Sequence, residues 1–252
     1  MLYVIPARDA DTALVFRRGP SAWWHLLEWR LDPPRLLPGA WFRGSLYPTR
    51  CDLSPDGRYL GYFALKPTAR DWPAAWFAVS KVPFLHALAA WRTAGTWTWG
   101  CRFAAERSLA IHACMEDKPF HGAYPHKAAC HGMSCDWAAR EVWNETKRGW
   151  EPENSSILRR RRPGGGPSLV LIHGGEGKSR DYLIESSAGN IIALPDAVWC
   201  DWDRAGRLLT ATRQGALSLS LWDHNEPRPL WTADLKALRP APAPPPDWAT
   251  RW

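Results

Sequence analysis

A pattern of about ten residues recurs along this chain at intervals near 50 residues, and it constrains the fold more than any other feature of the sequence. Each copy starts with cysteine, has an apolar residue at its third position and a polar turn in its middle, and is apolar again at its ninth position. The three clear copies are 51–60, 101–110 and 200–209. A fourth, degenerate copy is expected to start at Trp150. A period near 50 divides the 252 residues into about five units.

The first copy indicates how such a unit folds. Pro55 fixes the backbone for the second position of a turn, and Gly57 accepts the positive φ that ends one. Residues 58–65 are aromatic and apolar, as in a strand buried on both faces. After the last copy, 216–223 alternates leucine with serine at the period of a half-buried strand. Each unit is therefore predicted to be a strand, a turn and further strands.

The composition favours the same fold class. The chain contains 18 Trp and 23 Pro, and bulky aromatic residues with many turn-formers favour short strands over long helices. We therefore predict an all-β chain. Two segments differ: 83–92 is predicted to be a short helix or a long outer strand, and 136–143 a short helix with Asp136 at its N-cap.

Two stretches are close to a known repeat. Cys-Asp-Leu-Ser-Pro-Asp-Gly-Arg-Tyr-Leu at 51–60 and the Trp222-Asp223 dipeptide that ends a strand resemble a WD-repeat-like β-propeller blade. The resemblance extends over about 48–65 and 196–232; the Gly-His pair of that family is absent, and only one unit ends in Trp-Asp. It implies a small β-propeller of about five blades. A sandwich of repeated hairpins is the alternative.

The resemblance also suggests how the chain is divided. We expect one propeller-like domain over 1–238, with an irregular loop at 115–167, and then a Pro-rich, extended tail over 239–252. No apolar stretch has the ~18 residues of a membrane span, and the N-terminus lacks a leader pattern. We therefore expect a cytoplasmic protein with reduced cysteines and no membrane partner.

Two motifs of enzyme families are incomplete. The segment 174–179 ends like a phosphate-binding loop, but Ile172 stands where that loop needs glycine, and 180–184 predicts a strand instead of a helix. Glu185 stands where the nucleophile elbow of an α/β-hydrolase needs glycine. Asp201 and Asp203 could form a carboxylate pair, but are interpreted as turn caps. No cofactor is expected.

Cysteine and histidine are concentrated in the segment 112–135, which therefore leaves one metal hypothesis open. Thiolate and imidazole groups suit tetrahedral zinc, but the spacing of the cysteines is not that of a paired knuckle. We assign no metal ligand, and whether zinc binds is undecided for His112, Cys114, Cys130, His131 and Cys135.

A run of arginines suggests a different ligand. Arg159, Arg160, Arg161 and Arg162 precede three glycines, and in a mobile loop they would bind anions such as nucleic acid in a salt-sensitive manner. The alternative is a solvated surface turn. The chain carries a net charge of +7, which attracts polyanions without specifying one.

The tryptophans suggest a protein partner. On a strand, Trp23 and Trp24 must point to opposite faces, whereas Trp97 and Trp99 share a face. We predict that these residues belong to a partner-binding patch, and that the protein is a non-catalytic scaffold for another protein. The alternatives are a metalloprotein or hydrolase using 112–135 or central carboxylates, and a nucleic-acid binder using Arg159–Arg162.

Overall fold

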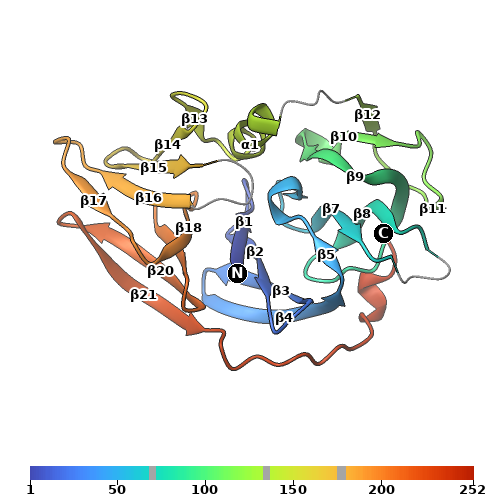
Figure 1. The fold of residues 1–252 in the computed structure, drawn as a ribbon. Helices are drawn as coiled ribbons and strands as arrows, with labels where there is room; N and C mark the ends of the chain where they lie inside the picture. The colour runs from blue at the N-terminus through green and yellow to red at the C-terminus, as the bar shows by residue number, and fades with distance from the viewer. Residues whose placement is uncertain (68–71, 133–136, 175–179) are drawn as a thin grey trace. The chain divides into compact units, whose positions relative to one another are not determined.

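The computed structural model describes residues 1–67, 72–132, 137–174 and 180–252. The described chain is built mainly of strands, so the all-β prediction is confirmed (Figure 1). The chain divides into two compact units. Unit 1 contains Met1–Val4 and Asp136–Leu238, and unit 2 contains Ile5–Cys135 and Arg239–Trp252. No helix in the described ranges is long and apolar enough to span a membrane.

One four-stranded sheet begins at the N-terminus. Its strands pair in chain order, and they are β1 (Leu2–Pro6), β2 (Thr12–Arg18), β3 (Trp23–Leu31) and β4 (Pro34–Arg43). The second and third strands are almost continuously buried, because they consist of apolar runs such as Ala13–Phe16.

The larger sheet of unit 2 is organised around one long strand. Its strands are β5 (Ser45–Leu46), β6 (Asp52–Leu53), β7 (Tyr59–Leu65), β8 (Ala75–Lys81), β9 (Ala89–Phe103), β10 (Leu109–Met115), β11 (His121–Gly122) and β12 (Ala128–His131). The start of β9 pairs with β8, and its end pairs with β10. The segment 83–92 therefore contains the start of a strand, and the helix alternative is wrong. The strand is not an outer one, because β9 lies between β8 and β10 in the sheet.

Unit 1 contains a helix and two antiparallel sheets. The helix α1 (Trp137–Thr146) lies where a short helix was predicted; Asp136, the expected N-cap, is outside the described residues. One sheet has β13 (Glu151–Pro152), β14 (Ile157–Arg161), β15 (Ser168–His173), β16 (Arg180–Glu185) and β17 (Ile191–Ala193). The other has β18 (Ala197–Trp202), β19 (Leu208–Thr212), β20 (Ala216–Asp223) and β21 (Glu226–Asp234).

The hairpin predicted from the repeat is present in every copy. In the copies that start at Cys101, Trp150 and Cys200, the third residue pairs with the ninth, in the pairs Phe103–Leu109, Pro152–Leu158 and Trp202–Leu208. In all three the amide of the fourth residue donates to the carbonyl of the eighth, from Ala104, Glu153 and Asp203. The degenerate copy at Trp150 is therefore a true repeat.

A fifth copy lies at the N-terminus, where the sequence pattern did not reveal it. The amide of Ala7 donates to Thr12 O at 2.9 Å, and the amide of Ser54 donates to Tyr59 O at 2.8 Å. Both turns are one residue longer than the other three. Counting back from Ala7, this copy starts at Val4, which is fully buried as Cys51 is. The pattern missed it because valine stands in place of cysteine.

The turns share a backbone conformation as well as a register. The seventh residue of three copies has a positive φ: 74° at Gly57, 62° at Arg107 and 72° at Gly206. Glycine suits this left-handed conformation, whereas arginine adopts it at an energetic cost. The repeat is thus preserved in backbone geometry where the sequence has diverged.

The segment 115–167 is more regular than expected. It contains β11, β12, α1, β13 and β14. Arg159, Arg160 and Arg161 lie in β14 and do not belong to a mobile loop, so that expectation is corrected. The strand forms because Leu158 is buried against β15, with which β14 pairs over its whole length.

Candidate binding pocket

A cavity of about 430 Å³ lies on the surface of unit 2, and we call it the tail-side pocket. Its walls come from β2, β3, the turn after β6, the ends of β7 and β8, and the C-terminal tail. The lining residues are Thr12, Glu28, Arg30, Asp56, Gly57, Arg58, Tyr59, Lys81, Val82 and Trp248. Five of these side chains are ionisable acids or bases, and two are aromatic.

The repeat turn fixes one acidic wall of the pocket. Ser54 Oγ donates to Asp56 Oδ1 at 2.6 Å, and Arg107 donates to Asp56 Oδ2 at 2.7 Å. Burial alone would raise the pKa of Asp56, but the hydrogen bonds from Ser54 and Arg107 outweigh it and lower the pKa below its usual value. Asp56 is therefore an ionised structural group whose charge Arg107 already compensates.

The basic groups of the pocket differ in how they are paired. Arg30 Nε lies 3.0 Å from Glu28 Oε1, so these two charges compensate each other. Arg58 Nε is 3.9 Å from Asp56, and its side chain is 74% exposed. Lys81 Nζ donates to the carbonyl oxygen of Trp248 at 2.9 Å, and no described carboxylate lies within ion-pair distance of it. Arg58 and Lys81 are thus the cations that can accept a ligand.

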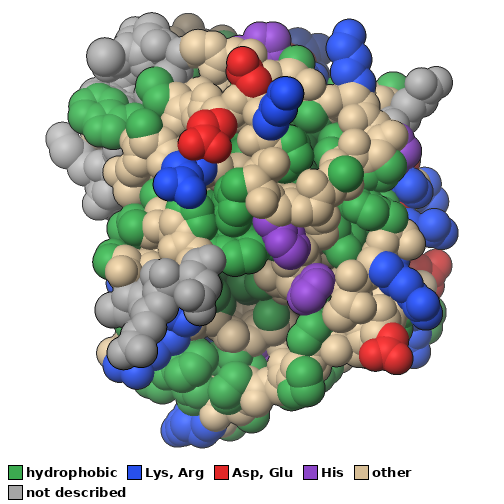
Figure 2. Space-filling model, turned by 90° about the vertical axis from the view of Figure 1, so that its right-hand side faces the viewer, with side chains coloured by type: hydrophobic (Ala, Val, Ile, Leu, Met, Phe, Trp, Pro, Cys, Tyr) green, Lys and Arg blue, Asp and Glu red, His purple; other side chains and the backbone are tan. Residues whose placement is uncertain are grey.

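The end of the tail supplies the aromatic side of the pocket. The Trp248 side chain is half exposed and packs edge-on against Phe84, with ring centroids 5.5 Å apart. Trp252 lies 5.7 Å from the ring of Tyr59 and 5.4 Å from that of Tyr124. The described residues 240–246 form no helix or strand, and Arg239–Trp252 belongs to unit 2. Hydrophobic patches with histidines among them are also visible on the face drawn in Figure 2.

The tryptophans singled out from the sequence lie elsewhere. Trp24 is buried, Trp23 is half-buried against Trp41, and both belong to β3. Trp97 is 53% exposed and Trp99 is half-buried on β9, in a different sheet. The structure therefore does not place the two pairs on one strand or in one sheet. Trp248 and Trp252 were not chosen from the sequence, although both lie in the short segment after the polyproline run.

The four arginines of the predicted anion site all have partners within unit 1. Arg159 pairs with Glu153 and Glu185, Arg160 with Asp201 at 3.0 Å, and Arg161 with Glu151 at 3.2 Å. Arg162 donates to Gly206 O at 2.7 Å and lies over the Trp202 ring. An anion would have to compete with these contacts. Binding of nucleic acid at this run stays a prediction.

The zinc candidates are brought together only in part. His112 and His131 are partners on the parallel strands β10 and β12, with stacked rings 4.8 Å apart. Cys114 is exposed, and Cys130 packs against the core of unit 2. Cys135 lies outside the described residues. In the described part of the chain, no three His, Cys, Asp or Glu side chains are grouped as a metal site.

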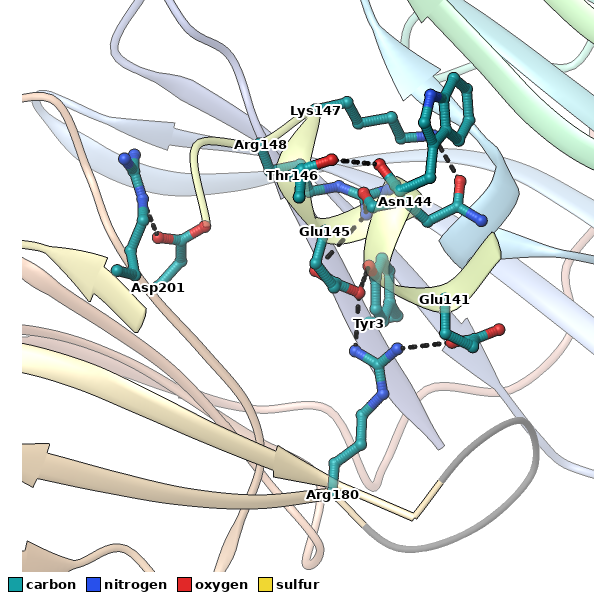
Figure 3. A network of polar contacts seen from close by, with 11 residues as sticks. Tyr3, Glu141, Asn144, Glu145, Thr146, Lys147, Arg148, Arg180 and Asp201 are labelled. Atoms are coloured by element: carbon teal, nitrogen blue, oxygen red, sulfur yellow. Dashed lines mark hydrogen bonds and ion pairs between the residues drawn. The ribbon is translucent and has the colours of Figure 1, made fainter. Parts of the chain in front are cut away.

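A second polar group, the buried charge cluster, lies within unit 1 (Figure 3). It consists of Tyr3, Glu141, Glu145, Arg148 and Arg180, with α1 supplying both glutamates. Glu145 Oε1 accepts from Arg180 at 2.9 Å and from the Tyr3 hydroxyl at 3.2 Å, and Arg180 also donates to Glu141 at 3.2 Å. These contacts form one connected network.

The electrostatics of this cluster are those of a structural ion-pair network. Burial alone would raise the pKa of Glu145, but Arg180 and Arg148 outweigh it and lower that pKa. Burial raises the pKa of Tyr3 well above its ordinary value. Glu145 is therefore ionised and Tyr3 neutral at physiological pH. Of the two aspartates interpreted above as turn caps, Asp203 accepts from the amides of Ala205 and Arg207 and is confirmed in that role. For Asp201 the interpretation is wrong, because it lies in β18 and its carboxylate pairs with Arg160.

Comparisons with known proteins add little to this geometry. No protein-family model matches the chain, and no curated protein matches it. An uncharacterized protein from Listeria monocytogenes has 8% identity to this chain and a TM-score of 0.29, over 91% of this chain and 53% of that one. This chain thus spans about half the length of that protein. The β-propeller domain of the Trilobed protease from Pyrococcus furiosus has 10% identity and a TM-score of 0.26, over 91% and 70%. At such low TM-scores neither likeness establishes the fold.

Proposed function

We propose that this protein is a non-catalytic binding module, built on a small β-propeller of about five blades, that binds another protein at the tail-side pocket. The propeller is supported by five hairpins at a near-constant spacing, four of them predicted from the sequence. Finding the hairpin starts Val4, Cys51, Cys101, Trp150 and Cys200 arranged around no common axis in an experimental structure would overturn it.

The observation that supports binding most strongly is the exposure of Trp248 beside two cations. Trp248 is 50% exposed and lines the same pocket as Arg58 and Lys81. Tryptophan and arginine are enriched among the residues that dominate binding energy at protein interfaces. Both carboxylates of the pocket are committed to arginines, Glu28 to Arg30 and Asp56 to Arg107. The arrangement therefore suits binding better than acid–base catalysis.

The proposal is tested by replacing the exposed indole. Trp248→Ala keeps the backbone carbonyl that Lys81 contacts and removes the aromatic surface. We expect partner capture by the purified protein to weaken by about 2 kcal/mol or more, with the melting temperature unchanged. Leu230→Ala is the matched control, because Leu230 is 45% exposed on β21 of unit 1.

Two results would contradict this function. Equal loss of capture in Trp248→Ala and Leu230→Ala would remove the specific role of the pocket. Capture that disappears on nuclease treatment would identify nucleic acid as the partner.

A further inference from the structure

We infer that the tail-side pocket recognises an acidic peptide segment, in which a carboxylate stands next to an apolar or aromatic side chain. This inference rests on the proposed function and specifies the chemistry of the partner.

The first step is the charge balance of the lining. Arg30, Arg58 and Lys81 stand against Glu28 and Asp56. Arg30 is paired with Glu28, and the charge of Asp56 is compensated by Arg107, which is not a lining residue. The positive charges of Arg58 and Lys81 therefore remain for a ligand, and a ligand carboxylate complements them.

The second step is the position of the ammonium group. An ammonium group has three N–H donors, and Lys81 uses one of them on the carbonyl of Trp248. That hydrogen bond ties Lys81 to the backbone of Trp248, and the half-exposed Trp248 lines the same pocket. A ligand carboxylate that accepts from Lys81 therefore lies in a pocket with an aromatic wall, and this favours an acidic residue next to an apolar one.

The third step separates peptides from nucleic acids. The pocket also holds the ionised Asp56 carboxylate, whose lowered pKa keeps it charged, together with Glu28. A phosphate backbone would place several charges near these acids, whereas a peptide can place one carboxylate between Arg58 and Lys81. The mixed charge of the lining therefore favours an acidic peptide.

The experiment compares defined probes on the full chain by fluorescence anisotropy. The probes are a labelled synthetic peptide in which glutamates flank one tryptophan, the same peptide with glutamines instead, and an oligothymidine. We expect the glutamate peptide to bind at least about ten-fold more tightly than the glutamine peptide. Its affinity should fall as the salt concentration rises from about 50 mM to about 300 mM.

Charge-reversal variants test whether the glutamate peptide binds at the tail-side pocket. Lys81→Glu and the exposed Arg58→Glu should each weaken binding of the glutamate peptide by about ten-fold or more. Arg161→Glu makes the same charge change on β14 of unit 1, where the side chain is 78% exposed, and should change binding by less than about two-fold. Using two pocket variants guards against misfolding of one.

The outcomes separate the inference from the proposed function. Equal binding of the two peptides, no binding of either, or unchanged binding in both Lys81→Glu and Arg58→Glu overturns the acidic-peptide inference. If Trp248→Ala still abolishes partner capture in those cases, the binding function stands without it. Tighter binding of the oligothymidine than of the glutamate peptide, lost in the pocket variants, overturns both in favour of nucleic acid.

Discussion

The two units use charged side chains in opposite ways. Unit 1 buries Glu141, Glu145 and Arg148 with less than a tenth of each exposed. Arg180 pairs with both glutamates, and Arg148 pairs with Glu145. Unit 2 keeps Arg58 and Lys81 at a surface pocket, where each has at most a weak or neutral partner. The first arrangement favours stability through mutual compensation, and the second leaves charge available for a ligand. Charge density alone therefore does not identify a binding site.

The comparison also explains why the arginine run and the pocket differ in what they can bind. Each arginine from 159 to 162 is held by an acid or a carbonyl of its own unit. An incoming anion would have to displace those partners, and the free energy lost with those contacts would weaken its binding. The ammonium group of Lys81 donates to a neutral backbone carbonyl, so a ligand carboxylate can bind it without displacing an ion pair.

The largest effect is expected from breaking the buried charge cluster. Glu145→Ala leaves the Arg180 and Arg148 guanidinium groups without the carboxylate that compensates them. We expect a loss of about 3–5 kcal/mol in the free energy of unfolding, measured by urea denaturation. The matched control is Glu151→Ala, whose exposed ion pair with Arg161 should contribute less than about 1 kcal/mol. Similar losses in both variants would show that burial does not distinguish these ion pairs.

A smaller effect is expected from a buried histidine of unit 2. Burial, and then the nearby charge of Arg17, lower the pKa of His25 to about 4. Its ring is stacked on Trp41 at 4.0 Å, and neither ring nitrogen has a hydrogen-bond partner among the described residues. The unfolded chain therefore binds a proton between about pH 6.5 and pH 4 that the folded chain does not.

Acid therefore destabilises the folded chain through His25. The stability contribution of neutral His25 is complete above about pH 6.5 and is lost as the pH falls towards 4, by at most about 3 kcal/mol. In His25→Phe, the midpoint of urea denaturation should therefore depend less on pH over that range. The acid-dependent loss due to Glu145 should persist, because a lowered pKa makes that loss begin only as the pH falls below the ordinary glutamate value of 4.5. An unchanged profile in His25→Phe would contradict the assignment.

The smallest effect concerns the repeated turn in the two units. A Cβ at Gly206 would lie 2.7 Å from the backbone oxygen of Pro163, whereas a Cβ at Gly57 would meet the side-chain methyl of Thr12. Both positions have a positive φ, so alanine is strained at each by about 1 kcal/mol or more. A side chain can rotate away but a backbone carbonyl cannot, so Gly206→Ala should be the more destabilising variant, by about 1 kcal/mol. Equal thermal unfolding of the two variants would contradict this reasoning.

The sequence was sufficient for features that depend on local periodicity. The strand–turn–strand units, the fourth copy at Trp150 and the short helix before it all follow from patterns within about ten residues. The tail-side pocket does not, because it depends on Lys81 meeting Trp248 across 167 positions of the chain. The partners of the arginine run were missed for the same reason: Glu185, which pairs with Arg159, and Asp201, which pairs with Arg160, are 26 and 41 positions away.

The long strand β9 has a consequence for how the repeat can change. Its first half completes the sheet of one repeat and its second half begins the next, from Ala89 to Phe103, with no intervening loop. Elsewhere a repeat could gain or lose residues at its connection without disturbing its neighbour. Within β9, an insertion of one residue that no bulge absorbs would reverse the faces of the side chains that follow it. The second and third repeats therefore share one continuous strand. We expect insertions and circular permutation to be tolerated between other repeats, and to destabilise the fold within β9.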